Sequence, residues 1–162
     1  LCLAVGTLDT VNDLPLALQL IRRSLRPDAP IFGALAGGNS LAALRAALIA
    51  ADRPGGRIAM RTHPRIEARA LAGLLSATGF AMPVVDVDRV RLTYARLADL
   101  VRDLRAVAAT GQLVERPPPL SRSAFNRAAA SFSGLGDGGR TEEVIEILHF
   151  LAWSPAIRQA PN

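Results

Sequence analysis

The sequence predicts an α/β fold: a parallel sheet with an antiparallel edge, covered by helices. Two short, wholly apolar runs, residues 1–6 and 31–36, have the composition of strands buried on both faces. A helical segment between them gives the strand–helix–strand order of a parallel sheet with helices on both faces. The alternating run 83–94 indicates a half-exposed strand near the sheet edge.

The first helix has marked ends. Asn12 or Asp13 caps its start, and Pro15 lies in the first turn, where a missing N–H group does no harm. Leucines and an isoleucine at helical spacing give it one apolar face. Pro27 and Pro30 follow the apolar positions and end the helix. The next strand therefore begins near residue 31.

The remaining elements follow from similar signals. Asn39 or Ser40 caps a second helix that runs to about Ala51, and Gly79 takes the left-handed position after a third helix. The run 142–153 indicates a long strand, although its Glu and Leu content leaves a helix open. The other helices are expected at about 66–80, 95–109 and 121–133.

Composition excludes several classes of protein. Half of the 162 residues are apolar, which excludes a disordered chain, and the single Cys2 cannot form an internal disulfide. All 19 basic residues are Arg, which indicates either an anion-binding surface or, the favoured interpretation, a GC-rich genome. No dense basic run with interleaved aromatics occurs, so nucleic-acid binding is not expected.

The hydropathy of the chain and its first residues predict its cellular location and whether sequence is missing upstream. No apolar run reaches the roughly 18 residues of a membrane span, and no signal-peptide pattern occurs, so a soluble, cytoplasmic protein is expected. The chain begins at Leu1, inside an apolar run. A domain rarely starts on a core strand, and we therefore expect a fragment whose upstream part is missing.

Ligands of open parallel sheets bind beyond the carboxyl ends of the strands. Two such ends occur here, in "AVGTLDTVND" and in "AGGNSL". Gly37 and Gly38 would let the backbone approach a ligand, and a helix N-terminus at Asn39 would offer free N–H groups to an anionic or polar group. A tight strand-to-helix turn explains the two glycines equally well.

Other polar residues give weaker signals. His63 and His149 have no Cys companion, so no metal site is expected. Asp86 and Asp88 alternate with valines and share one face of a strand, where a solvated surface is favoured over paired acid–base chemistry.

The stretch "TVNDLPLALQLIRRSLRPDAPIFGALAGGNSLAALRAAL" and the later "LAGLLSATGFAMPVVDVDRVRLTYARLADLVRDLR" resemble one family. The family is that of the class I S-adenosylmethionine-dependent methyltransferases, and the two stretches resemble the C-terminal part of these proteins. The branch is that of mitochondrial complex I assembly factor five and the malonyl-carrier-protein methyltransferases. The resemblance spans residues 1–155, with 156–162 as a tail. It implies a partial Rossmann-like methyltransferase sheet, which consists of strands four to seven of a seven-stranded sheet without the N-terminal cofactor-binding half.

The resemblance also implies a site for S-adenosylmethionine, whose binding by this chain alone is expected to be weak or absent. The implied cofactor-binding residues are Ala4, Val5, Gly6 and Leu8. The implied substrate-binding residues are Asp9, Thr10, Gly38, Asn39, Ser40 and Arg45. Methyl transfer depends chiefly on proximity and alignment, so no catalytic residue is assigned.

The chain departs from the branch at one pair of positions. The branch usually has His-Trp where this chain has Asp9 and Thr10. Asp9 would attract a cationic sulfonium or an Arg substrate, but a degenerate site is equally compatible. The leading hypothesis is therefore methyl transfer to a protein or a small acidic substrate, including one bound to a carrier protein. The alternative is a non-methylating assembly factor, or an Arg hydroxylase-like protein, for a respiratory complex. An oligomer through the exposed sheet flank is a further expectation.

Overall fold

The structure is a computed structural model that describes residues 1–56 and 58–156. Apart from Ala156, the expected tail lies outside the described residues. Contacts within the chain define two compact units. Unit 1 contains Leu1–Gly38, Arg65–Arg89 and the chain from Glu146, and unit 2 contains Asn39–Pro64 and Val90–Ile145.

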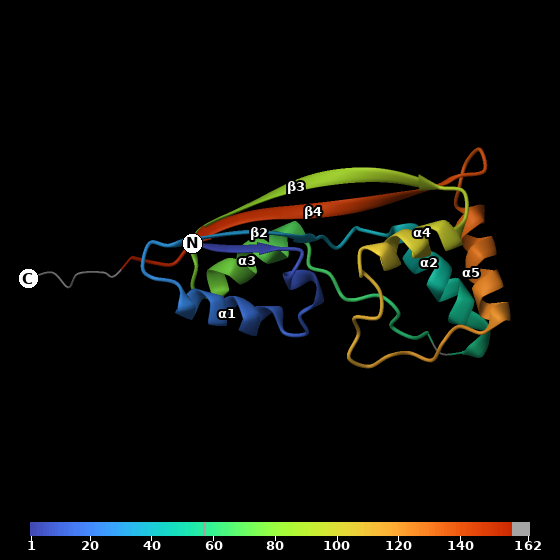
Figure 1. Cartoon of the computed structure of the whole chain (residues 1–162), viewed down its shortest axis with the longest axis horizontal. Helices are drawn as coiled ribbons and strands as arrows, with labels where there is room; N and C mark the ends of the chain where they lie inside the picture. The colour runs from blue at the N-terminus through green and yellow to red at the C-terminus, as the bar shows by residue number, and fades with distance from the viewer. Residues whose placement is uncertain (57, 157–162) are drawn as a thin grey trace, which may run out of the picture. The chain divides into compact units, whose positions relative to one another are not determined.

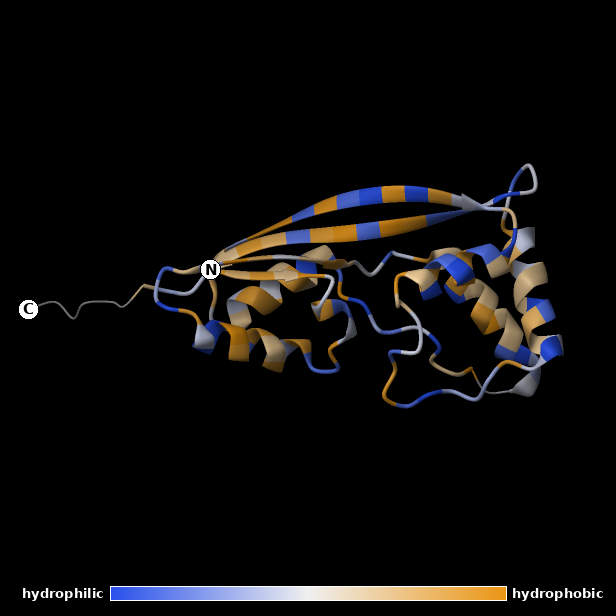
Figure 2. Ribbon diagram, in the orientation of Figure 1, coloured by the Kyte–Doolittle hydropathy of each residue, from blue (hydrophilic) through white to orange (hydrophobic). Residues whose placement is uncertain are grey.

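A four-stranded sheet organises the chain (Figure 1). Its strands are β1 (Cys2–Val5), β2 (Pro30–Ala36), β3 (Ala81–Tyr94) and β4 (Thr141–Trp153), in the spatial order β1-β2-β4-β3. β1 and β2 are parallel, whereas β4 is antiparallel to β2. The predicted parallel pair and antiparallel addition are confirmed, and the run 142–153 is a strand rather than a helix. Figure 2 shows the predicted alternation of β3, which lies at a sheet edge.

Two helices of unit 1 form where the sequence predicted them. In α1 (Leu14–Ser24), the Asp13 side chain accepts a hydrogen bond from Leu16 N at 2.8 Å and caps the first turn. α3 (Ala68–Ala77) is followed by Gly79 at a φ of +91°. Glycine occupies this left-handed conformation without a Cβ penalty.

The core of unit 1 lies between the two helices and one face of the sheet. Ile31 and Phe150 are buried there against Leu18 of α1 and Leu71 of α3. The opposite face includes Leu3, Val5 and Phe32, which are 68%, 69% and 43% exposed. Among the described residues of unit 1, helices therefore cover one face of the sheet, and the expectation of cover on both faces was wrong.

Unit 2 is helical and has a core of its own. It contains α2 (Ala42–Asp52), the 3-10 turn η2 (Arg53–Gly55), α4 (Leu97–Ala106) and α5 (Arg122–Gly134). The fully buried apolar side chains of this core come from all three α-helices and include Ala47, Leu97, Leu100, Ala128 and Phe132.

The start of α2 differs from the prediction. Neither Asn39 nor Ser40 caps the helix; Leu41 occupies the N-cap position with a φ of +58°. Glu143 of β4 supplies the missing acceptor. Its carboxylate accepts from Ala43 N at 3.2 Å and from Leu44 N at 2.5 Å. A carboxylate distant in sequence thus replaces the local cap and complements the positive end of the helix dipole.

Candidate functional site

In unit 1, the carboxyl ends of β1 and β2 meet as the sequence predicts for a parallel pair. Gly6 N donates to Ala34 O at 2.9 Å, which extends the pairing beyond β1. The chain then forms the 3-10 turn η1 (Leu8–Thr10). From this turn, the half-buried Asp9 carboxylate accepts a hydrogen bond from Ala36 N at the end of β2. Asp9 therefore bridges the two strand ends.

The four predicted cofactor-binding residues differ in what they can present to a ligand. Ala4 and Leu8 are 4% and 7% exposed and belong to the core of unit 1. Val5 is 69% exposed, and a Cβ added to Gly6 would meet no atom within 4 Å. Val5 and Gly6 thus offer an apolar side chain and an open backbone at the strand tip, whereas Ala4 and Leu8 support them from beneath.

The backbone after β2 does not offer the free N–H groups that were expected. Gly37 N donates to Glu146 O at 2.8 Å, and Gly38 N donates to Ile66 O at 2.9 Å. In unit 2, the first amides of α2 donate to Glu143. These four N–H groups are therefore not available to the anionic or polar group that was one of the two interpretations of this turn.

Close packing explains the two glycines. A Cβ on Gly37 would lie 2.5 Å from Glu146 Oε2, and one on Gly38 would lie 3.1 Å from Glu67 Oε1. Of the two interpretations of this pair, a tight turn is therefore what the structure contains.

The other predicted substrate residues are spread over both units. Thr10 is half-buried in unit 1. In unit 2, Asn39 is exposed, Ser40 is fully buried and Arg45 is half-buried. The side chain of Ser40 therefore lies below the surface, and the roles of all these residues stay predictions.

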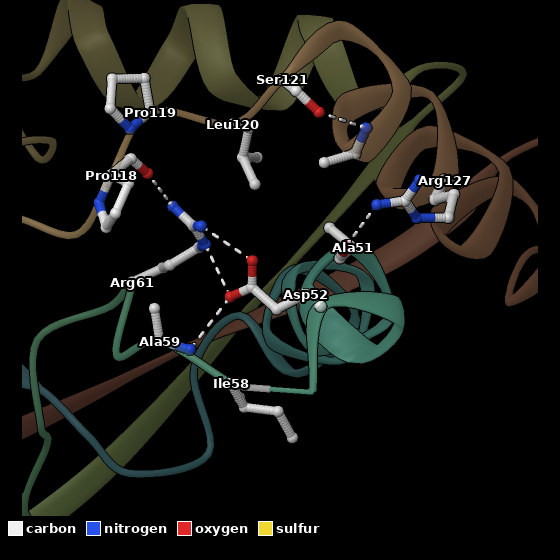
Figure 3. Close-up of a pocket in the computed structure, with 12 residues that line it drawn as sticks. Ala51, Asp52, Ile58, Ala59, Arg61, Pro118, Pro119, Leu120, Ser121 and Arg127 are labelled. Carbon is white, nitrogen blue, oxygen red and sulfur yellow. Dashed lines mark hydrogen bonds and ion pairs between the residues drawn. The ribbon is translucent and has the colours of Figure 1, made fainter.

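A cavity of about 470 Å³ lies within unit 2 (Figure 3). It is formed where the end of α2 and the segment 58–61 face the segment 118–127 at the start of α5. Most of its wall is apolar. The lining residues are Ala51, Asp52, Gly55, Ile58, Ala59, Arg61, Pro118, Pro119, Leu120, Ser121, Ala124 and Arg127.

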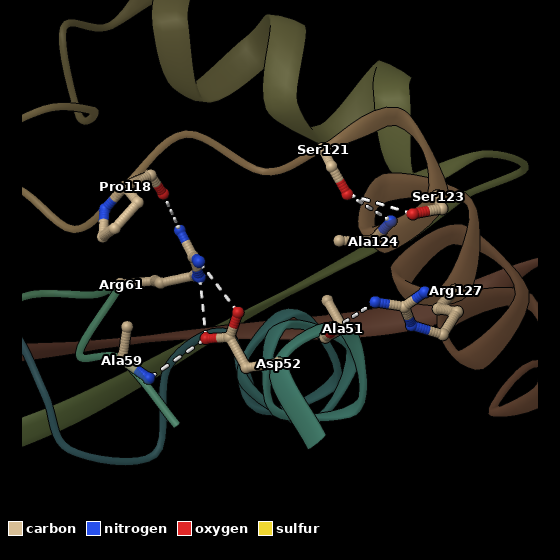
Figure 4. A network of polar contacts seen from close by, with 9 residues as sticks. All are labelled: Ala51, Asp52, Ala59, Arg61, Pro118, Ser121, Ser123, Ala124 and Arg127. Carbon is tan, nitrogen blue, oxygen red and sulfur yellow. Dashed lines mark hydrogen bonds and ion pairs between the residues drawn. The ribbon is translucent and has the colours of Figure 1, made fainter. Parts of the chain in front are cut away.

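A bidentate ion pair holds one side of this cavity (Figure 4). Arg61 Nε and Nη2 donate to the two carboxylate oxygens of Asp52 at 2.9 and 2.8 Å, and Ala59 N donates to the same carboxylate at 3.1 Å. Arg61 Nη1 donates to Pro118 O at 2.8 Å. The pair thus connects α2, the segment 58–61 and the proline segment. The hydrogen bond from Arg61 lowers the pKa of Asp52 below its ordinary value, although burial opposes this shift.

The other side of the cavity is formed by α5. Its Ser121 side chain accepts from Ala124 N at 3.2 Å and caps the helix. Arg127 Nη2 donates to Ala51 O at 2.9 Å, in the last turn of α2. This contact places a guanidinium at the negative end of that helix dipole.

Sequence reasoning did not find this cavity. Asp52 and Arg61 are nine residues apart on either side of a Pro-Gly-Gly turn, which was a weak local signal for an ion pair. Arg127 carried no such signal, because its partner Ala51 is 76 positions away. Only the packing of α2 against α5 brings these residues together.

The remaining polar candidates are structural or solvated. His63 is half-buried, with Nδ1 2.9 Å from Pro64 O. Asp86 and Asp88 are exposed, and each accepts from the next backbone N–H group at 2.8 Å. Across residues 1–56 and 58–156, no three His, Cys, Asp or Glu side chains gather as a metal site would require. Within the same residues, every helix is too short or too polar to cross a bilayer.

The chain is similar in sequence to two groups of curated proteins. The arginine hydroxylase NDUFAF5 of Danio rerio is 33% identical over 154 residues, which cover 93% of this chain and 48% of that protein. Malonyl-(acyl-carrier protein) O-methyltransferase of Laribacter hongkongensis is 33% identical over 167 residues, which cover 96% of this chain and 54% of that protein. The chain is a homologue of both groups. The resemblance to this methyltransferase branch is thereby confirmed. No family model matches the chain.

The chain spans about half the length of the curated relatives it matches. Solved structures agree on the fold. A Bacillus halodurans protein assigned to the methyltransferases superposes with a TM-score of 0.56 and 9% identity, covering 95% of this chain and 68% of that one. The YcgJ protein of Bacillus subtilis superposes with a TM-score of 0.54 and 6% identity, and the superposition covers 94% of this chain and 62% of that one. The predicted α/β, Rossmann-like methyltransferase fold is confirmed.

Proposed function

We propose that the chain is part of an S-adenosylmethionine-dependent methyltransferase that transfers a methyl group to a protein or a small acidic substrate. The observation that carries this proposal is the pair of parallel strand ends bridged by Asp9 and Ala36. Ligands of open α/β sheets bind beyond such ends. The similarity to malonyl-(acyl-carrier protein) O-methyltransferases supports the reaction.

On this proposal, Val5 and Gly6 contact the cofactor, with Ala4 and Leu8 positioning the strand tip. The exposed Val5 side chain and the open Gly6 backbone fit an apolar part of a ligand. When bound, S-adenosylmethionine supplies the methyl group on a sulfonium cation. The Asp9 carboxylate favours that cation by Coulomb attraction. With little more than these residues to contact, this chain alone binds the cofactor weakly.

The substrate-binding residues that the resemblance implies stay proposals. They are Asp9, Thr10 and Gly38, which belong to unit 1, and Asn39, Ser40 and Arg45, which belong to unit 2. The acceptor is a protein side chain or an acyl group on a carrier protein; the second follows from the name of the Laribacter homologue. Cytoplasmic location and association through the exposed sheet flank remain predictions from the sequence.

A transfer assay tests the reaction. The chain is incubated with methyl-labelled S-adenosylmethionine in large excess and with malonyl-loaded acyl carrier protein. Label on the acceptor supports the proposal, and it should fall in Asp9→Asn but not in Asp137→Asn, an exposed carboxylate in unit 2. Absence of label on this acceptor and on a peptide library would contradict it.

The second candidate function is an assembly factor or an Arg hydroxylase-like protein for a respiratory complex. The observation that favours it is the similarity to arginine hydroxylases NDUFAF5, at 33% identity for Danio rerio and 30% for Homo sapiens. Mass spectrometry of Arg-containing acceptor peptides separates the two functions. Methyl transfer adds one carbon and two hydrogens, whereas hydroxylation adds one oxygen. Unmodified peptides that remain bound to the chain would favour the assembly role.

A further inference from the structure

We infer that the cavity of unit 2 binds a small organic anion with an apolar body, such as an alkyl carboxylate. The inference is independent of the proposed methyl transfer, because every lining residue belongs to unit 2 and no cofactor is involved. A cavity of about 470 Å³ lies within the size range of small-molecule sites, which are mainly apolar with a few polar groups that orient the ligand.

The apolar part of the wall would be covered by the body of the ligand. Ile58 is 62% exposed although it lines the cavity. Pro118 and Pro119 line the facing wall and are also exposed. An alkyl chain between these walls would remove their apolar surface from water, which is favourable by roughly 25 cal/mol per Å².

The charge of the cavity selects an anion. Among the described residues that line the cavity, the charged ones are Arg61, Arg127 and Asp52. Both oxygens of Asp52 accept hydrogen bonds from Arg61, so this carboxylate is neutralised and offers little to a cationic ligand. Arg61 in turn uses Nε, Nη1 and Nη2 within the protein.

Of the described arginines that line the cavity, Arg127 is the one with N–H groups left for a ligand. Arg127 Nη2 donates a hydrogen bond to Ala51 O, and this contact holds the guanidinium at the cavity. Arg127 is also exposed, so a ligand can reach it. The other N–H groups of an arginine can still donate, and a guanidinium binds a carboxylate through two parallel hydrogen bonds. Arg127 therefore positions the head of the ligand, and the wall around Ile58 positions its body.

Binding is tested on the 162-residue chain with octanoate, 1-octanol and octylammonium as probes, followed by amide NMR shifts. Octanoate should shift the amides of Ile58, Ala59 and Leu120, and it should bind more tightly than octanol. In Arg127→Gln, the dissociation constant for octanoate should rise about five- to ten-fold, the loss expected for one charge-assisted contact at a partly solvated site, while octanol is unaffected.

Two further variants make the test specific. Arg105→Gln removes an equal charge from an exposed residue of unit 2 that does not line the cavity, and it should leave octanoate binding unchanged. Ala59→Phe fills the cavity and should abolish binding of both probes; its fold is checked by amide dispersion. Octylammonium binding as tightly as octanoate, shifts confined to other residues, or no binding at millimolar probe would each overturn the inference.

Discussion

The Glu143 carboxylate accepts a hydrogen bond from the N–H group of Leu44 across 99 positions of the chain. Glu143 is 1% exposed, and it also accepts from Ala43 N. A buried carboxylate of β4 thus performs the capping that a side chain at residue 39 or 40 would perform in an ordinary helix. The start of α2 depends on the last strand of the chain.

Glu143→Ala should therefore destabilise the protein strongly. The substitution leaves two amides at the start of α2 without an acceptor, and we expect the free energy of unfolding to fall by about 2–4 kcal/mol. Glu143→Gln keeps one carbonyl acceptor and should cost about half as much. Urea denaturation followed by circular dichroism measures both. Equal stability of the wild type and Glu143→Ala would contradict this account of the cap.

The ion pair of Asp52 and Arg61 predicts a defined pH dependence. The pKa of Asp52 is lowered in the folded protein, so its contribution to stability is complete above the ordinary value of 3.8 and is lost as the pH falls through the lowered folded value. Asp52→Asn should destabilise the protein by about 2 kcal/mol at neutral pH, and this difference should shrink below a pH of about 4.

The measurement is denaturant unfolding at a series of pH values, with Asp137→Asn as the control. Asp137 is an exposed loop carboxylate in the same unit. Its substitution should change stability little at any pH. A destabilisation by Asp52→Asn that stays constant down to the lowest pH would show that the ionised carboxylate is not what stabilises the segment 58–61.

Gly33 should not tolerate a side chain. A Cβ at this position would lie 2.1 Å from the ring atom Cζ of Phe150, its partner in the antiparallel register of β2 and β4. Phe150 is 4% exposed, so its ring has little room to move. Gly33→Ala should lower the free energy of unfolding by about 1–3 kcal/mol, the usual cost of overpacking. The double variant with Phe150→Leu should recover part of this loss.

Gly73 provides the matched control. It lies on the exposed side of α3, and a Cβ there would meet no atom within 4 Å. Gly73→Ala should raise the free energy of unfolding by about 0.5–1 kcal/mol, because alanine is the better helix former. Thermal unfolding of the two single variants should thus shift in opposite directions; a parallel shift would contradict the packing described for Gly33.

On the proposed function, Asp9 both holds the two strand ends together and attracts the cofactor. Asp9→Asn retains an oxygen for the hydrogen bond from Ala36 N but removes the charge, so the fold should be retained while attraction for a sulfonium cation is lost. Calorimetric titration of the wild-type chain with S-adenosylmethionine should show weak binding at most, and weaker binding still for Asp9→Asn. Micromolar binding by the isolated wild-type chain would refute the weak-binding proposal.

Local signals predicted most of the elements, and long-range contacts explain what was missed. Asp13 caps α1 through a residue three positions away, so the sequence sufficed to find that helix. The cap of α2 comes from Glu143, 99 and 100 residues away, and no local pattern could indicate it. The meeting of the ends of β1 and β2 was predicted, because parallel strands end at the same edge of a sheet, while the ligand contacts expected there stay predictions. The cavity around Arg127 was not predicted, because it depends on tertiary packing.

The position of β4 has a consequence for how the protein is made. This strand, Thr141–Trp153, lies between β2 and β3, although it is the last of the four along the chain. The first three strands leave the ribosome before β4 does, and until then β2 lacks one of its two neighbours and β3 lacks the strand that pairs with it. The nascent sheet cannot close before the final strand emerges. During synthesis the pairing of β2 and β3 with β4 is therefore the last step in forming this sheet.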